Sequence, residues 1–199
     1  MSRLEAAFAK IDAANSADPT QIDDGGTLRP AELVYGERMS KVQGTLYPDA
    51  SDALQLAVRA QHLRRWEIPR ASYPQDRVGY LRWRTDLKRK HAEWAGEILA
   101  ACGYGAVDID RVGSLIRKEN LKQDAEAQAL EDVAALVFLE FYALDFAGKH
   151  EAEKVKSILA KTFAKMSPHG RHAALGLQVP EPLRGLVNAL AGRDPVRPI

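Results

Sequence analysis

Three polar residues in apolar surroundings have side chains of the types that bind metal ions. His62 and His91 each lie in a helical pattern whose apolar neighbours predict an inward-facing ring, and Asp132 lies in the apolar run LEDVAALV. A buried carboxylate is costly unless it meets a cation, a metal or hydrogen-bond donors. Two imidazoles and one carboxylate from three helices suit a single divalent metal, with Fe, Mn, Zn and Mg all open. We therefore predict His62, His91 and Asp132 as metal ligands.

Each of these predictions has a structural alternative. A single inward histidine is often a hydrogen-bonded core residue rather than a ligand. Asp132 could cap a helix, although Asp124, which precedes the same apolar run, fits that role better.

Two glutamates are candidate catalytic bases. Glu67 follows His62 by five residues, and Glu32 lies one helical turn before Tyr35. Either carboxylate could complete the ligand set, or could act as general base on a metal-bound water, whose lowered pKa makes hydroxide available near neutral pH. The alternative for Glu32 is a first-turn carboxylate that favours the dipole of its own helix.

Positive charge is concentrated in the middle of the chain. Residues 59–90 carry ten basic and three acidic side chains, against five and nine in residues 1–58 and thirteen and fifteen in residues 91–199. Most of the basic residues in this segment are arginines, and tryptophan and tyrosine are interleaved with them. Arginine binds phosphate bidentately and stacks on bases, so the mixture suits a nucleotide or nucleic acid. The basic segment and the expected helix over 30–46 together supply the predicted substrate-binding residues. These are Tyr35, Arg38, Arg64, Arg65, Trp66, Arg70 and Arg84.

Two structural explanations compete with this prediction. A charge run is commonly the solvated face of a helix. Alternatively, the arginines form buried ion pairs that hold the helices together, with acidic partners among Glu32, Glu67, Asp76, Asp86 and Glu140.

Helices must position these residues, because helical periodicity dominates and no stretch alternates apolar and polar residues long enough to predict a sheet. We expect an all-α, single-domain bundle of about seven to nine helices, with its core in residues 28–166, a loop over 14–29 and a flexible tail over 192–199. The apolar run from Asp124 onward is expected to be the buried central helix. The expected helices cover about 2–14, 30–46, 51–62, 76–101, 109–117, 124–146, 151–166 and 182–190.

Composition excludes several classes of protein. The chain has 199 residues, 46% hydrophobic and 28% charged, with a formal net charge of +1, which indicates a soluble globular domain. It lacks the ~20 consecutive apolar residues of a membrane span, and one cysteine, Cys102, excludes an internal disulfide framework. The charged opening MSRLEAAFAKIDAA does not suit a signal peptide, so we expect a cytoplasmic protein without a membrane partner.

The order of the motifs resembles the HD superfamily of all-α, metal-dependent phosphohydrolases. YGERM has Tyr35 at a histidine position of that superfamily, LAVRAQHL keeps His62 but has Leu63 at the aspartate, and HAEWAGEIL and LEDVAALV match the motifs that contain His91 and Asp132. The runs AQHLRRWEIPR, GYLRWRTDLKRKHAE and LEDVAALVFLEFY resemble more closely the bacterial and fungal family known as domain of unknown function 4202. The HD resemblance implies a metal site, reduced here to a single metal because two ligand positions differ.

Three functions follow as expectations. The first is a metal-dependent, HD-like hydrolase of a phosphorylated nucleotide or RNA-derived substrate. The second is a mononuclear or dinuclear iron oxygenase of HD-like type. The third is a degenerate HD-like module that binds a small anionic ligand or RNA without catalysis.

Overall fold

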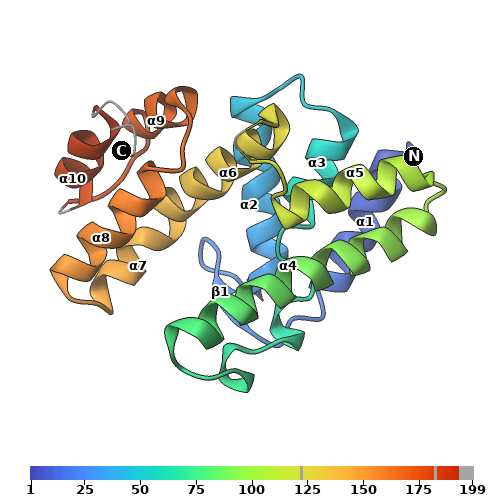
Figure 1. The fold of residues 1–199 in the computed structure, drawn as a ribbon, viewed down its shortest axis with the longest axis horizontal. Coiled ribbons are helices and arrows are strands. Elements are labelled where there is room, and N and C mark those ends of the chain that lie inside the picture. The colour runs from blue at the N-terminus through green and yellow to red at the C-terminus, as the bar shows by residue number, and fades with distance from the viewer. Residues whose placement is uncertain (122, 182, 193–199) are drawn as a thin grey trace.

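Helices form nearly all of the regular structure, as the sequence predicts (Figure 1). The structure is a computed structural model and describes residues 1–121, 123–181 and 183–192. Two short strands, β1 (Gln21–Asp23) and β2 (Leu28–Pro30), form an antiparallel hairpin. The ten α-helices of the described part are α1 (Arg3–Asn15), α2 (Ala31–Leu46), α3 (Asp52–Arg59), α4 (Arg77–Ala100), α5 (Ala106–Arg117), α6 (Ala125–Val137), α7 (Ala143–Gly148), α8 (Ala152–Phe163), α9 (Pro168–Leu175) and α10 (Leu183–Ala191).

Local capping chemistry explains where several helices begin. The Ser2 hydroxyl accepts a hydrogen bond from the backbone N–H of Glu5 to start α1, and Ser51 and Asp76 cap α3 and α4 in the same way. Asp124 caps α6 by accepting from two backbone N–H groups. A side-chain oxygen at this position satisfies an N–H that has no partner inside the helix. These predicted starts are therefore confirmed.

Three predictions differ from the structure. Residues 14–29 hold the end of α1 and the hairpin rather than a plain loop, because Gly25 and Gly26, at φ 69° and 90°, allow the tight turn. No helix is expected between residues 166 and 182, but Pro168–Leu175 forms α9, since Ser167 caps it and Pro168 fits its first turn. The helix expected to reach His62 ends at Arg59. The expected tail beyond residue 192 and the expected start at residue 182 lie outside the described residues.

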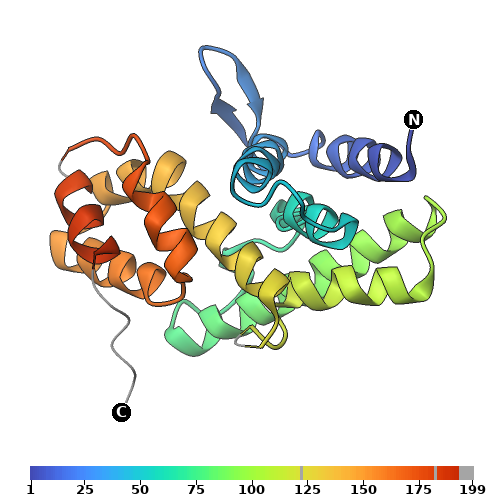
Figure 2. The ribbon, with the colours of Figure 1, turned by 90° about the horizontal axis from the view of Figure 1, so that it is seen from above.

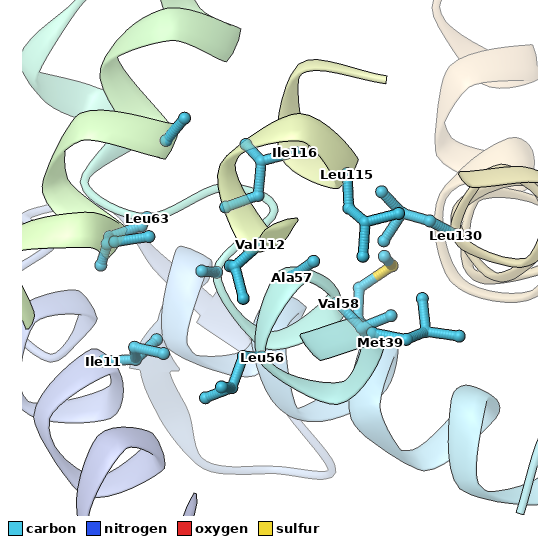
Figure 3. Close-up of a cluster of buried hydrophobic side chains, with 14 of the residues drawn as sticks. Ile11, Met39, Leu56, Ala57, Val58, Leu63, Val112, Leu115, Ile116 and Leu130 are labelled. Atoms are coloured by element: carbon cyan, nitrogen blue, oxygen red, sulfur yellow. The ribbon is translucent and has the colours of Figure 1, made fainter. Parts of the chain in front are cut away.

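Two apolar clusters form the interior, and α6 contributes to both. The first lies between α1 and the helices from α2 to α6, and Figure 3 shows Ile11, Leu56, Ile116 and Leu130 converging in it. The second lies between the last turn of α6 and the helices α7 to α10, and these four helices form one end of the molecule in Figure 2. The apolar run after Asp124 is thus the central helix that its composition predicts, continued by a π-helical turn at Phe138–Tyr142. Among the described helices, none combines the length and apolarity needed to cross a membrane.

Candidate functional site

One cavity of the described structure brings together six of the predicted site residues. Its volume is about 790 Å³, and it lies where α2, the chain after α3, the N-terminal half of α4 and the hairpin meet. Predicted residues that line it are Glu32, Tyr35, His62, Arg65, Trp66 and Arg70. The other lining residues are mostly apolar or aromatic and include Trp83, Phe138 and Tyr142. An apolar cavity with a few converging polar groups is the usual form of a small-molecule site.

A carboxylate and an imidazole form the polar centre of this cavity. His62 Nδ1 lies 3.1 Å from Glu32 Oε2. An ionised carboxylate only accepts hydrogen bonds, so Nδ1 carries the proton and donates it, and Nε2 of the neutral ring keeps its lone pair. The Tyr35 ring stacks on the imidazole with centroids 3.8 Å apart and planes at 8°. The contacts therefore hold both the tautomer and the ring plane of His62.

Arg65 holds the other side of the carboxylate. Its Nη1 lies 3.4 Å from Glu32 Oε1, and its guanidinium lies 5.2 Å from the centroid of the Trp83 ring. The side chain is 35% exposed, so donors remain for a ligand in the cavity.

Two buried polar residues, one at the end of α1 and one in the loop after it, position the Glu32–His62 pair. Asn15 donates from Nδ2 to the carbonyl of Glu32 and accepts from the backbone N–H of Arg64, so it ties both segments together. Asp18 accepts from the backbone N–H of Glu32 at 3.0 Å and so caps α2, whose own N-cap, Pro30, makes no side-chain cap. Arg64 adopts φ 52°, a left-handed conformation that turns the chain immediately after His62 and Leu63.

His91 supports the same turn from α4. Its Nδ1–H donates to the carbonyl of Leu63 at 2.7 Å, and its ring centroid lies 6.1 Å from that of His62. The residue is only 3% exposed. Burial, together with the charge of His62, lowers the pKa of His91 to about 3, so the ring is neutral at physiological pH.

Burial and neighbouring charges also set the protonation of the central pair. Burial raises the pKa of Glu32, but the hydrogen bonds and charges of His62 and Arg65 outweigh it and hold that pKa below its usual value. Burial lowers the pKa of His62, and the charges of Arg65 and Arg84 add to this against the opposing effect of Glu32. At neutral pH the cavity therefore contains an ionised Glu32 and an unprotonated Nε2 on His62.

Asp132 lies elsewhere, and the structure does not bring it to the two histidines. It is fully buried at 0% exposure and accepts hydrogen bonds from Tyr47, Gln128 and both the backbone N–H and the hydroxyl of Ser167. Both carboxylate oxygens thus bind donors at the start of α9. Within the described ranges, no three His, Cys, Asp or Glu side chains are grouped so that they could hold a metal ion. The predicted ligand set is not assembled, because Asp132 faces the junction of α6, α2 and α9.

Four other predicted residues lie outside the cavity lining. Arg38 pairs with Asp24 and stacks on Phe141, which attaches the hairpin to α2. Arg64 and Glu67 pair with each other at 2.6 Å on the surface. Arg84 is exposed and has no hydrogen bond or ion pair with the described residues, although its charge acts on His62.

Comparison with models of known protein families assigns the chain to one of them. The model described as Domain of unknown function (DUF4202) matches residues 5–187. The chain belongs to this family. No curated protein and no solved structure matches it. The resemblance to the HD superfamily stays a prediction.

The family match covers all of the cavity lining, including residues that sequence reasoning missed. Asn15, Asp18 and Tyr142 were not predicted, and Asp18 and Tyr142 line the cavity. A signal existed for Asp18, because a helix that starts after proline lacks its own capping side chain and an Asp-Pro-Thr turn precedes it. No local signal marked Asn15, whose two partners are 17 and 49 residues away.

The buried ring of His91 predicts a pH dependence of stability. The unfolded chain binds a proton at this ring below a pH of about 6.5, whereas the folded protein does so only near pH 3. The contribution of His91 to the free energy of unfolding is therefore fully present above pH 6.5. It falls by about 1.4 kcal/mol per pH unit as the pH decreases toward 3.

Urea unfolding from pH 7 to pH 4 measures the effect. We expect His91→Gln to unfold at lower urea at pH 7 but to show a shallower decrease of the free energy of unfolding with falling pH. His172→Gln, which changes an exposed histidine, is the matched control and is expected to keep the wild-type slope. Equal slopes for all three proteins would contradict a neutral, buried His91.

Proposed function

We propose that the cavity binds and hydrolyses a phosphate ester of a nucleotide or RNA-derived substrate, with His62 as general base. The observation that carries the proposal is the Glu32–His62 pair inside an aromatic cavity that also contains Arg65. A carboxylate that holds an imidazole by Nδ1–H leaves Nε2 as proton acceptor and stabilises the imidazolium that forms.

The lining supports a ligand with an aromatic base and a phosphate. Trp66, Trp83 and Tyr142 offer apolar and aromatic surface, on which a base can stack. Arg65 offers donors that a phosphate can accept in pairs. Arg70 lines the cavity as well, but its guanidinium also donates to the backbone carbonyls of Tyr73 and Asp76 and so stiffens the loop.

The proposed reaction transfers one proton twice. His62 Nε2 takes a proton from water as the water oxygen forms a bond to phosphorus, and the phosphorus bond to the leaving oxygen breaks. The imidazolium then returns the proton to the leaving alcohol. Arg65 stabilises the negative charge of the phosphoryl oxygens. The described residues do not form the predicted ligand set, so the proposed reaction uses the side chains of the cavity. The iron oxygenase rests on the same set and gains no support from this geometry.

A substrate screen tests the proposal. The wild-type protein is incubated with nucleoside 2′-, 3′- and 5′-monophosphates and 2′,3′-cyclic phosphates, with and without a chelator, and products are separated by chromatography. We expect hydrolysis of one class to persist with the chelator. Arg65→Ala should weaken binding about tenfold or more, because a charge-assisted contact is lost. Arg117→Ala, which changes an arginine paired with Glu119 at the end of α5, is the matched control.

Two outcomes would contradict the proposal. Hydrolysis that the chelator abolishes would indicate a metal site formed in another way. Binding without turnover across the whole panel would favour the module that binds an anionic ligand without catalysis.

A further inference from the structure

A second group of cations lies beside the cavity, on the face where α4, the end of α5 and α6 meet. Two lysines pair with Glu131 of α6. Lys118 is the C-cap residue of α5, and Lys165 follows α8. Their side chains are 10% and 60% exposed, and that of Glu131 is 13% exposed. Lys88 and Arg84 of α4 lie near enough for their charges to act on the same residues. Glu131 thus pairs with two lysines, and the charges of Lys88 and Arg84 act on the same group.

The four cations outnumber the one carboxylate of Glu131, so the group carries excess positive charge. Burial, followed by the charges of Lys118 and Arg84, lowers the pKa of Lys88, and burial with the charges of Arg84 and Lys165 lowers that of Lys118 despite its pairing with Glu131. Like charges that disfavour one another's protonated forms also disfavour the fold. An anionic group placed among them would remove the repulsion, and the surface position of Lys165 and Arg84 leaves it room.

Arg84 links this cluster to the cavity. Arg84, Lys88 and His91 are spaced four and three residues apart, so they share one face of α4. The charge of Arg84 acts on His62 and Tyr35 on one side and on Lys118 and Glu131 on the other. Trp83, which lines the cavity, directly precedes Arg84 on α4, so the cationic face of this helix begins beside the cavity and continues to Lys88.

We propose that Arg84, Lys88, Lys118 and Lys165 bind a second phosphate group of the substrate, which makes the preferred substrate a single-stranded oligonucleotide with its terminal nucleotide in the cavity. The inference rests on the proposed function and adds the substrate class. A mononucleotide would fill the cavity but leave the cluster empty, so the two ligands should differ in affinity and in salt dependence.

The test compares a fluorescein-labelled uridine decamer with uridine monophosphate, measured by polarisation and by competition. The double variant Lys88→Gln, Lys165→Gln removes two cations and leaves the buried Lys118–Glu131 pair intact. The control Lys41→Gln, Lys149→Gln removes the same charge from exposed lysines on α2 and after α7. Circular dichroism melting verifies that both variants fold.

We expect the first double variant to bind the decamer about tenfold more weakly and to lower the slope of log K against log salt by about 0.7, since the contact to one phosphate is lost. Its affinity for uridine monophosphate should stay within about twofold of wild type. An unchanged affinity for the decamer, an equal loss in the control, or a wild-type protein that binds the decamer no better than the monophosphate would each overturn the inference. Failure of the proposed hydrolysis is distinguished from these outcomes, because it appears as absent turnover with decamer binding retained.

Discussion

Replacing His62 with Ala is expected to lower kcat/KM for phosphate-ester hydrolysis by about 10²–10⁴-fold, because the proton acceptor is lost. Glu32→Gln should cause a loss of similar order. The amide keeps the size of the side chain but can donate as well as accept, so it no longer specifies the Nδ1–H tautomer, and it lacks the charge that stabilises the imidazolium. Both variants are measured by product release with the substrate that wild type hydrolyses.

Two matched variants make this result specific. Glu67→Gln changes the other glutamate that the sequence offers as a base, and that side chain pairs with Arg64 on the surface, outside the cavity lining. His172→Ala changes an exposed histidine of α9. Both are expected to keep kcat/KM within about twofold of wild type. A loss in Glu67→Gln with none in Glu32→Gln would assign the base to the other glutamate and contradict the proposed site.

The pH profile gives an independent check on the same pair. Because burial and the neighbouring arginines lower the pKa of His62, the basic form persists below the range in which an exposed histidine becomes protonated. We expect kcat/KM to be constant near pH 7 and to decrease only at a pH below that of ordinary histidine titration. A decrease centred above pH 7 would contradict an unprotonated His62.

Asp132→Ala is expected to destabilise the protein by about 3–5 kcal/mol, since it removes a fully buried acceptor and leaves its donors without partners. Ser167 loses an acceptor for both its backbone N–H and its hydroxyl, and Tyr47 and Gln128 lose one each. The affected contacts join α9 to α6 and to the end of α2. Asp132→Asn should cost less, because one oxygen can still accept.

Urea unfolding measures this difference, with Asp145→Ala on the exposed side of α7 as the control. The result also separates the two roles considered for Asp132. A residue that fastens helices lowers the midpoint of unfolding while the folded fraction keeps its affinity for ligand in the cavity. A variant of wild-type stability that loses bound metal would instead restore the predicted ligand role.

The helix starts could be predicted because their chemistry is local. Ser2, Asp76 and Asp124 each bond to backbone groups two or three residues ahead, so the signal and its partner lie in the same short stretch of chain. The hairpin was missed because two three-residue strands are too short to show an alternating pattern. The predicted extent of α3 is too long, since the helix ends at Arg59. The turn that follows it is held by contacts from distant parts of the chain, because Asn15 bonds to Arg64 and His91 bonds to Leu63.

Apolar periodicity, caps and residue composition are properties of the chain, so the all-α class, the family and the chemical types gathered around His62 could be predicted from them. The carboxylate that pairs with His62 could not be predicted in this way. Glu32, Glu67 and Asp132 were all acceptable carboxylates, and they lie 30, 5 and 70 positions from His62 along the chain. Only the tertiary structure selects among them, because Asn15 and Asp18 hold Glu32 against the imidazole, whereas the donors around Ser167 hold Asp132 at the far junction. Burial and distance in space, rather than residue type, decided which carboxylate shares the cavity.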